Sequence, residues 1–328
     1  MKTPIVALLF LALATTGCEK EHFINDEGNL VPKTVDLDAS LPSIFVNGTH
    51  LHSEAFGNPA DPMLVVLHGG PGNDYRYILN CKAFADSGYY VVFYDQRGSG
   101  LSRREAKDSY SIQTMPDDLE AVISHYSTSA SQKIFLLGQS WGAILASIYV
   151  NEHPSAISGL ILCEPGGLKW QDIKDFVARE RSYSLTDETL NDATYLDQFL
   201  TGNEDEQAVL DYKQALVAAS EGQPGNPLGN EGPIPFWRYG AVVNKAMFDL
   251  GEKEKPDWTT NLHSFPKPVF IAYSERNTAY GYDHAVHVSS AFSEVQLELI
   301  KGTGHDMLTF TTGFNNFFPK ACAYLKSL

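Results

Sequence analysis

The stretch GQSWG, residues 138–142, places one serine between two glycines that lie two positions to either side of it. It follows the apolar run KIFLLG (133–138), a predicted strand, and it precedes residues with the apolar spacing of a helix. A G-x-S-x-G motif in this context forms a sharp turn that holds the hydroxyl above a sheet and points a helix N-terminus at it. We therefore predict that Ser140 is a catalytic nucleophile.

A serine hydroxyl needs a base to take its proton, and that base is most often histidine. In chains with this motif the histidine follows the serine, after the last strand of the sheet. Of the ten histidines, His305 has this placement, because it follows the apolar run VQLELI (295–300) and a loop with two glycines. We predict that His305 is the general base.

The negative charge that develops on a substrate carbonyl needs hydrogen-bond donors already in place. One is expected from the backbone N–H of Trp141, directly after the serine, and the other from the loop after the run MLVVLH (63–68). That loop reads HGGPG, residues 68–72, and its glycines allow a backbone to approach a substrate closely. Because proline has no N–H, we predict Gly70 as the second donor. The alternative, a tight turn without a ligand, leaves three glycines and a proline unexplained.

Four continuous apolar runs predict strands that position these residues, at 63–68, 89–94, 133–138 and 157–163. Two further strands are predicted at 268–273 and 295–300, where the alternation of strands and helices resumes. Runs without alternation are typical of strands buried on both faces, as in a parallel sheet. Crossover helices are expected between them, for example over 117–126 and 143–150, and a hairpin turns at Asn47-Gly48. The pattern predicts an α/β fold, with an open, mostly parallel sheet and helices on both faces.

Residues 165–262 interrupt this alternation because they contain no buried strand. One helix is predicted by an apolar stripe of Val209, Tyr212, Leu216 and Ala219. A loop rich in Gly and Pro follows at 221–235, and a second helix is predicted over 236–249. We interpret the segment as a helical cap inserted into a core of residues 34–164 and 263–328. An independent domain is the alternative, but the flanking strands are expected in one sheet.

The first 18 residues, MKTPIVALLFLALATTGC, have a different character. One positive charge, Lys2, precedes an apolar run over 5–14 that is too short to span a bilayer and suits a secretory signal. The segment resembles a bacterial lipoprotein signal, in which lipidated Cys18 becomes the mature N-terminus. We predict a signal peptide at 1–17 and a polar tether at 18–33. The protein is then expected at the bacterial cell envelope, bound to the membrane through Cys18 and facing the periplasm or the surface; an ordinary signal peptide or a buried strand is the alternative.

Composition excludes other classes of function. The chain has 328 residues, 43% of them hydrophobic, which is enough for a large core. Its net charge is −16, with no basic run, so no nucleic-acid partner is expected. C-x-x-C, H-E-x-x-H and G-x-G-x-x-G motifs are absent from the sequence, and we expect no metal and no cofactor.

The segments LHGGPG (67–72), YDQRGSG (94–100) and GQSWG (138–142) together resemble the proline iminopeptidase-like serine peptidases of the α/β-hydrolase fold. The resemblance extends from about residue 44 to the end and is weakest in the cap. It implies an α/β-hydrolase core that releases an N-terminal residue, often proline, from small peptides by means of Ser140 and His305. It also implies that Asp95 and Arg97 shape the floor of the site.

The cap departs from the family pattern. Family caps carry a Trp-Glu element whose glutamate binds the free amine of the substrate, and the counterpart here is Trp237-Arg238. We predict that Trp237 and Arg238 bind substrate, with the arginine favouring an anion. Acidic residues elsewhere that could bind an amine instead are Glu204, Asp205, Glu206 and Glu231. An esterase or amidase acting on another small acyl substrate is the alternative enzyme, and a non-catalytic ligand-binding lipoprotein is the alternative outside enzymes.

A catalytic histidine also needs a carboxylate on its second ring nitrogen. In this fold the acid usually lies in the turn after the strand at 269–273, where Asn277 stands here. Glu275 and Asp283 are the carboxylates near that position. The sequence thus leaves the ordinary acid position neutral.

Glu164 is the second candidate for the acid, because it directly follows the strand at 157–163. Haloalkane dehalogenases and some lipases resemble this arrangement. A carboxylate at the C-terminal end of a strand faces the crevice of an α/β sheet. We predict Glu164 as the acid; the alternatives are an acid in the 275–283 turn, or a Glu164 that binds a substrate amine or caps the start of the inserted segment.

Overall fold

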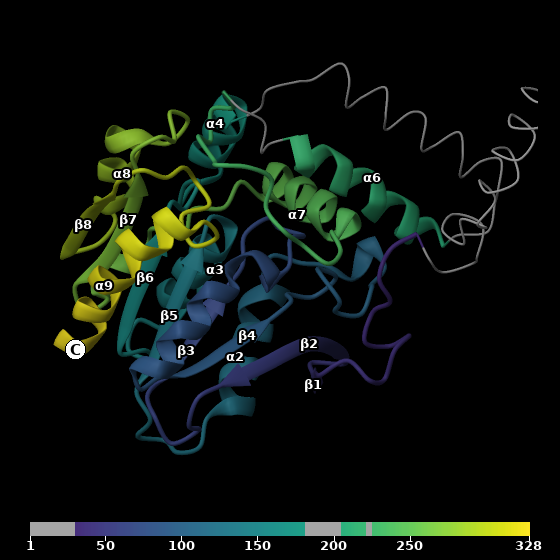
Figure 1. The fold of residues 1–328 in the computed structure, drawn as a ribbon, viewed down its shortest axis with the longest axis horizontal. Coiled ribbons are helices and arrows are strands. Elements are labelled where there is room, and N and C mark those ends of the chain that lie inside the picture. Colours follow the sequence, from purple (N-terminus) through teal and green to yellow (C-terminus); the bar gives the residue numbers. More distant parts are fainter. Residues whose placement is uncertain (1–29, 181–204, 221–224) are drawn as a thin grey trace, which may run out of the picture.

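The computed structural model describes residues 30–180, 205–220 and 225–328. In this part of the chain an eight-stranded sheet forms the centre, in the order β1-β2-β4-β3-β5-β6-β7-β8 (Figure 1). The strands are β1 (Ser43–Val46), β2 (Thr49–Phe56), β3 (Met63–Leu67), β4 (Tyr90–Tyr94), β5 (Ile134–Gln139), β6 (Gly159–Cys163), β7 (Val269–Ser274) and β8 (Val295–Ile300). β2 pairs antiparallel with both β1 and β4, and the strands from β3 to β8 are parallel to one another. The predicted α/β fold and mostly parallel sheet are confirmed.

Helices and short 3-10 segments connect the strands. The helices are α2 (Thr114–Tyr126), α3 (Trp141–Glu152), α4 (Trp170–Glu180), α6 (Glu206–Ser220), α7 (Ala241–Glu254), α8 (Gly281–Ser289) and α9 (Thr311–Ser327). The 3-10 segments are η1 (Tyr75–Ser87), η2 (Lys107–Ser109) and η3 (Leu262–Ser264). The two crossover helices that the sequence predicts lie within α2 and α3.

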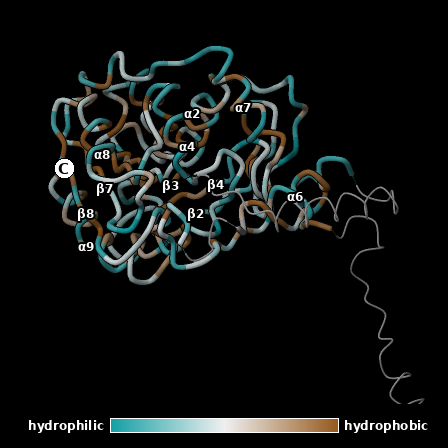
Figure 2. Tube along the Cα trace, turned by 90° about the horizontal axis from the view of Figure 1, so that it is seen from above, coloured by the Kyte–Doolittle hydropathy of each residue, from teal (hydrophilic) through white to brown (hydrophobic). Residues whose placement is uncertain are grey.

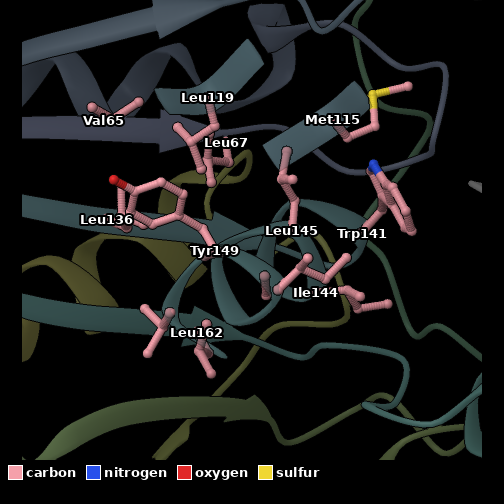
Figure 3. Close-up of a cluster of buried hydrophobic side chains, with 14 of the residues drawn as sticks. Val65, Leu67, Met115, Leu119, Leu136, Trp141, Ile144, Leu145, Tyr149 and Leu162 are labelled. Carbon is pink, nitrogen blue, oxygen red and sulfur yellow. The ribbon is translucent and has the colours of Figure 1, made fainter. Parts of the chain in front are cut away.

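The central strands β3, β4, β5 and β6 are buried on both faces, which explains why their sequences do not alternate. On β3, Val65 and Leu67 belong to the cluster formed with α2 and α3, and Figure 3 shows this face with residues such as Leu119 and Leu145. The intervening β3 side chains pack with η1 and α9 in the second cluster. Every residue of β3 is therefore apolar, because both sides of the strand face a core.

Helices α4, α6 and α7 lie in the segment between β6 and β7, and these two strands pair in parallel within the one sheet. Figure 2 places α6 at the end of the molecule away from β8 and α9. The helix predicted from the stripe at Val209 is confirmed as α6, although the side chain of Ala219 and residues 221–224 lie outside the described residues. The sequence predicts no helix at α4, even though Trp170, Ile173 and Phe176 have helical spacing and are buried.

The helix predicted over 236–249 begins later than expected, at Ala241. The preceding backbone is bonded to the core instead. Asp74 accepts hydrogen bonds from the N–H groups of Trp237 and Arg238, and the N–H of Gly240 donates to the carbonyl of Gly72. Backbone N–H groups with these partners do not need helical ones, so the helix starts only at residue 241.

The predicted signal peptide at 1–17 and the lipidation site at Cys18 lie outside the described residues, as does the tether before residue 30. Among the helices that the structure describes, none combines the length and the apolar character needed to cross a bilayer.

Candidate active site

Ser140 lies where β5 ends and α3 begins. Its backbone has a positive φ, with φ 56° and ψ −120°, which is strained for a residue with a Cβ. The two glycines of the motif make the turn possible. A Cβ at Gly138 would meet the carbonyl of Gly142, and a Cβ at Gly142 would meet the carbonyl of Leu67. The turn leaves Ser140 partly exposed between buried neighbours.

Glu164 holds the corresponding place at the end of the neighbouring strand, β6. The N–H of Ser140 donates to the carbonyl of Cys163, and the N–H of Glu164 donates to the carbonyl of Ala272 on β7. Like Ser140, Glu164 has a positive φ, at 45°. Such strain persists only where the surrounding structure imposes it, and it is concentrated at functional sites.

The carboxylate of Glu164 is fully buried and accepts four hydrogen bonds. Its Oε1 accepts from the backbone N–H and the hydroxyl of Ser274, each at 2.6 Å. Its Oε2 accepts from Asn277 Nδ2 at 2.7 Å and lies 2.7 Å from His305 Nδ1. A buried carboxylate needs donors of this kind, because a buried charge without partners is costly.

His305 is buried and fixed from several sides. Its N–H donates to the carbonyl of Leu228 at 2.8 Å, its carbonyl accepts from Gln139 Nε2 at 3.0 Å, and the ring of Phe176 lies 5.8 Å from its own. Burial acts to lower the pKa of the imidazole, but the hydrogen bond and the charge of Glu164 outweigh it and raise this pKa to about 9.

The other carboxylates that the sequence offers as the acid lie elsewhere. Glu275 is exposed and accepts a hydrogen bond from the N–H of Gly302 at 2.8 Å. Asp283 is exposed on α8. Of these candidates, the one that bonds to His305 is Glu164.

The two predicted oxyanion donors border the same cavity as Ser140. Trp141 is the first residue of α3, where backbone N–H groups have no partner within the helix. In the glycine loop, the N–H of Gly69 donates to Tyr77 Oη at 2.6 Å. Gly70 has a φ of 121°, and a Cβ there would lie 2.5 Å from the nitrogen of Gly72. The loop therefore requires glycine at position 70, where φ is positive.

Two glutamines connect the three motifs. Gln96 Oε1 accepts from the indole Nε1 of Trp141 at 2.9 Å, and Gln96 Nε2 donates to the carbonyl of His68 at 2.8 Å. Gln139 carries its side chain from the residue before the serine to the carbonyl of His305. The nucleophile turn, the glycine loop and the histidine loop thus share one hydrogen-bonded frame.

Asp95 and Arg97, on either side of Gln96, have partners of their own. Asp95 is buried, with Oδ2 2.7 Å from Nδ1 of His52, and the guanidinium of Arg97 pairs with Asp118 at 2.7 Å. Neither is among the residues that border the cavity.

The cavity at this site has a volume of about 400 Å³. Ser140 and His305 border it beneath apolar side chains of the inserted helices, such as Phe176 and Met247. Apart from His305 and Tyr239, the ionisable side chains among its described lining residues are Glu180 and Asp306. Both are acidic, and a negative charge on either attracts a positively charged group in the cavity.

Asp306 follows His305 directly in the chain and is 7% exposed. Asn230 Nδ2 donates to its Oδ2 at 2.5 Å, and Gln139 Nε2 donates to its Oδ1 at 3.3 Å. Burial raises the pKa of this carboxyl, and a cation bound beside it would counter that effect. Neither Asp306 nor Glu180 belongs to a motif in the sequence; the signal available there is that Asp306 directly follows His305.

The structure corrects the prediction that Trp237 and Arg238 bind substrate. Arg238 is 4% exposed, and its Nε lies 2.7 Å from Asp211 Oδ2, so its charge is paired. The ring of Trp237 packs edge-on against Tyr75 and His52, with centroids 5.0 and 5.3 Å apart. Neither residue borders the cavity. Both instead hold the start of α7 against the core.

The acidic residues that the sequence offers for amine binding are engaged elsewhere or lie outside the described residues. Asp205 accepts a hydrogen bond from the N–H of Ala208 at the start of α6, and Glu231 pairs with Arg276 at 2.6 Å. Glu204 is outside the described part of the chain. Glu206 belongs to the first turn of α6 and does not border the cavity. In the part of the chain that the structure covers, no group of three His, Cys, Asp or Glu side chains is arranged to hold a metal ion.

The class of α/β hydrolases is defined by a parallel sheet that has a strained serine turn at the end of one strand. In this chain the end of the next strand carries a carboxylate that is hydrogen-bonded to a histidine. The profile of the alpha/beta hydrolase fold family matches residues 62–310. The chain belongs to this family.

Its relatives within the family include peptidases. A stretch of 105 residues is 37% identical to the proline iminopeptidase of Thermoplasma volcanium, covering 32% of this chain and 34% of that protein. A stretch of 106 residues is 42% identical to the proline iminopeptidase of Lactobacillus helveticus, covering 31% and 35%. The chain thus matches about a third of the length of these relatives.

Solved structures share the fold over most of the chain. The proline iminopeptidase of Mycobacterium smegmatis has a TM-score of 0.57 and 19% identity, covering 87% of this chain and 97% of that one. An esterase from Exiguobacterium antarcticum has a TM-score of 0.56 and 22% identity, covering 87% and 99%. At these identities the likeness concerns the fold alone.

Proposed function

We propose that this protein is a serine hydrolase whose catalytic residues are Ser140, His305 and Glu164. The observation that carries the proposal is the 2.7 Å contact between Glu164 Oε2 and His305 Nδ1 at the cavity that Ser140 borders. A carboxylate on Nδ1 holds the ring tautomer that leaves Nε2 able to accept a proton, and it stabilises the imidazolium formed when that happens.

In the proposed cycle, His305 Nε2 takes the proton of Ser140 Oγ while Oγ bonds to the substrate carbonyl carbon. The carbonyl electron pair moves onto oxygen, where the N–H groups of Gly70 and Trp141 donate to it. The bond to the leaving group then breaks, and His305 returns the proton to that group. Water attacks the acyl-enzyme in the same way, releasing the acid and restoring the serine.

The substrate class that we propose is a small peptide with a free N-terminus, from which the first residue is released. Glu180 and Asp306 support this proposal, because an N-terminal ammonium group would bind favourably at an acidic wall. The partial resemblance to proline iminopeptidases has the same implication. The cavity volume of about 400 Å³ suits a ligand of this size.

An ester or amide without an amine is the second candidate substrate. Apolar and aromatic side chains border much of the cavity, among them Trp170, Phe176 and Phe248. A hydrophobic acyl group would bury its surface against them.

The test has two stages. Labelling of the purified protein by a fluorophosphonate, with the modified peptide located by mass spectrometry, is expected at Ser140; absence of labelling there would refute the serine mechanism. A panel of aminoacyl 4-nitroanilides, each compared with its N-acetylated form and with acyl esters, then tests the substrate class. We expect the free-amine forms to be preferred.

Variants of the acidic wall make this second stage sharper. Asp306→Asn and Glu180→Gln should raise KM for free-amine substrates by roughly tenfold, since each removes a charge near the bound cation. They should leave KM for the N-acetylated forms nearly unchanged. Equal changes for both forms would favour the ester or amide alternative.

We also infer that the protein acts at the bacterial cell envelope, bound to the membrane through a lipidated Cys18. The support is the sequence of residues 1–18, with its short apolar run shortly before a cysteine.

A further inference from the structure

Asn277 stands in the turn after β7, and its amide faces the acid of the proposed catalytic set. Its Nδ2 donates to Glu164 Oε2 at 2.7 Å. Its Oδ1 accepts from the backbone N–H groups of Ala279 at 3.0 Å and Tyr280 at 3.2 Å, at the start of α8. Because the oxygen is engaged by two backbone donors, the nitrogen is the end that faces Glu164. The residue is 2% exposed, so water does not compete for these groups.

Asn277 and His305 bond to the same carboxylate oxygen. Asn277 Nδ2 and His305 Nδ1 each lie 2.7 Å from Glu164 Oε2, and the two nitrogens are 3.3 Å apart. When Nδ1 carries its proton toward Glu164, both nitrogens are donors, and the carboxylate is the acceptor between them. The amide therefore fixes the oxygen that orients the histidine, without bonding to the histidine itself.

We propose that Asn277 is a positioning residue that holds Glu164 against His305, and that positions 164 and 277 form a pair of acid sites of which one must be neutral. The proposal rests on the serine mechanism proposed above. An aspartate at position 277 would keep the shape of asparagine and place a second carboxylate oxygen where the Nδ2 atom now lies, 2.7 Å from Glu164 Oε2. Two carboxylates at such a distance cannot both be charged, so they share a proton. The neutral amide is what leaves Glu164 free to serve His305 alone.

The test compares wild type with Asn277→Asp, Glu164→Gln and the double variant Glu164→Gln/Asn277→Asp. Aspartate retains the oxygen that accepts from the N–H groups of Ala279 and Tyr280, so the turn before α8 is kept while the donor to Glu164 is lost. The readout is the rate of Ser140 labelling by a fluorophosphonate across a pH series, which needs no knowledge of the natural substrate.

Each variant has its own expected outcome. Asn277→Asp should slow labelling by roughly tenfold near neutral pH, because Glu164 then shares a proton with the aspartate introduced at position 277 and binds His305 less tightly. Glu164→Gln should be slower than wild type by roughly 10² or more. The double variant should be at least about tenfold faster than Glu164→Gln, because the aspartate introduced at position 277 then supplies the carboxylate and the glutamine introduced at position 164 supplies the neutral donor.

The outcomes separate this inference from the proposed function. Wild type that is not labelled at Ser140 overturns the function itself. The inference is overturned if wild type is labelled while the double variant is as slow as Glu164→Gln and the Asn277→Asp profile equals that of wild type. Asn277 would then only hold the turn before α8. If the double variant does not fold, the NMR signal of the His305 Nδ1 proton decides between the same two outcomes: it should move in Asn277→Asp, and an unchanged signal contradicts the positioning role.

Discussion

Glu164 Oε2 lies 2.7 Å from His305 Nδ1, although the two residues are 141 positions apart in the chain. The carboxylate comes from the end of β6 and the imidazole from the loop after β8, and β7 lies between those strands in the sheet. The contact exists because a Glu side chain at the end of β6 extends past β7, where Asn277 leaves the ordinary acid position without a charge.

Removal of the nucleophile is the first prediction. Ser140→Ala should lower kcat by roughly 10⁴ to 10⁶, since only binding and the oxyanion donors remain. Ser147 is a matched control: it lies on the helix that follows the nucleophile, and its hydroxyl donates to the carbonyl of Ala143. Ser147→Ala should keep most of the activity. A purified Ser140→Ala protein with near-normal turnover would sink the serine mechanism.

Loss of the acid is the second prediction, and it concerns both rate and pH dependence. Glu164→Gln should lower kcat by roughly 10² to 10⁴ with little change in KM. Glu164 is what raises the pKa of His305 to about 9, so without it burial prevails and the pKa falls. The acid limb of kcat/KM should therefore move to lower pH. Glu275→Gln is the control, because this exposed carboxylate does not contact His305; a large loss there would return the acid to the 275–283 turn.

The same pKa shift predicts how stability depends on pH. The pKa of His305 is raised on folding, from the ordinary 6.5 to about 9. The folded protein thus binds a proton more tightly than the unfolded chain does. The resulting stabilisation is complete below pH 6.5 and is lost as the pH rises through about 9. Urea unfolding at a series of pH values should show this loss in wild type and a flatter profile in His305→Gln. Equal slopes for the two proteins would contradict the shift.

The buried ion pair of Arg238 provides the fourth prediction. Arg238 and Arg104 both bond to Asp211 Oδ2, at 2.7 and 2.9 Å, and Asp211 is fully buried. Arg238→Ala should cost about 3 kcal/mol in the free energy of unfolding, because it breaks a buried pair. Arg276→Ala, which breaks a partly exposed pair with Glu231, should cost about 1 kcal/mol or less. A stable Arg238→Ala protein with altered preference for anionic substrates would restore the substrate-binding role.

The fifth prediction concerns the N-terminus. Mass spectrometry of the protein from its natural host should find residues 1–17 removed and Cys18 carrying lipid. Cys18→Ser should release the protein from the membrane fraction while leaving the hydrolase activity of the extract intact, because the site lies far along the chain. Recovery of an intact Met1 or of an unmodified Cys18 would contradict the anchor.

The sequence alone determined the sheet and much of the candidate site. The central strands β3, β4, β5 and β6 were predictable because burial on both faces requires continuous apolar runs, and such runs are visible without coordinates. The turn at Ser140 was predictable because its close backbone contacts exclude a Cβ at two positions, which leaves glycine as the signature. Glu164 was an expectation for a similar reason, since the residue after a parallel strand faces the crevice.

Only the tertiary structure decided which partners meet. Arg238 was expected to meet a substrate, but Asp211 of α6, 27 residues earlier, is paired with it. Asp306 and Glu180 border one cavity only because the histidine loop and α4 pack around it. In the sequence, Asn277 is a neutral residue at the position where the acid usually lies. Its contact with Glu164 shows that its amide is a hydrogen-bond donor. Local spacing indicates which way a side chain points from its own element. The role of a buried charge or amide depends on the group that is hydrogen-bonded to it or pairs its charge. That group is brought near by packing between distant elements, which no local pattern encodes.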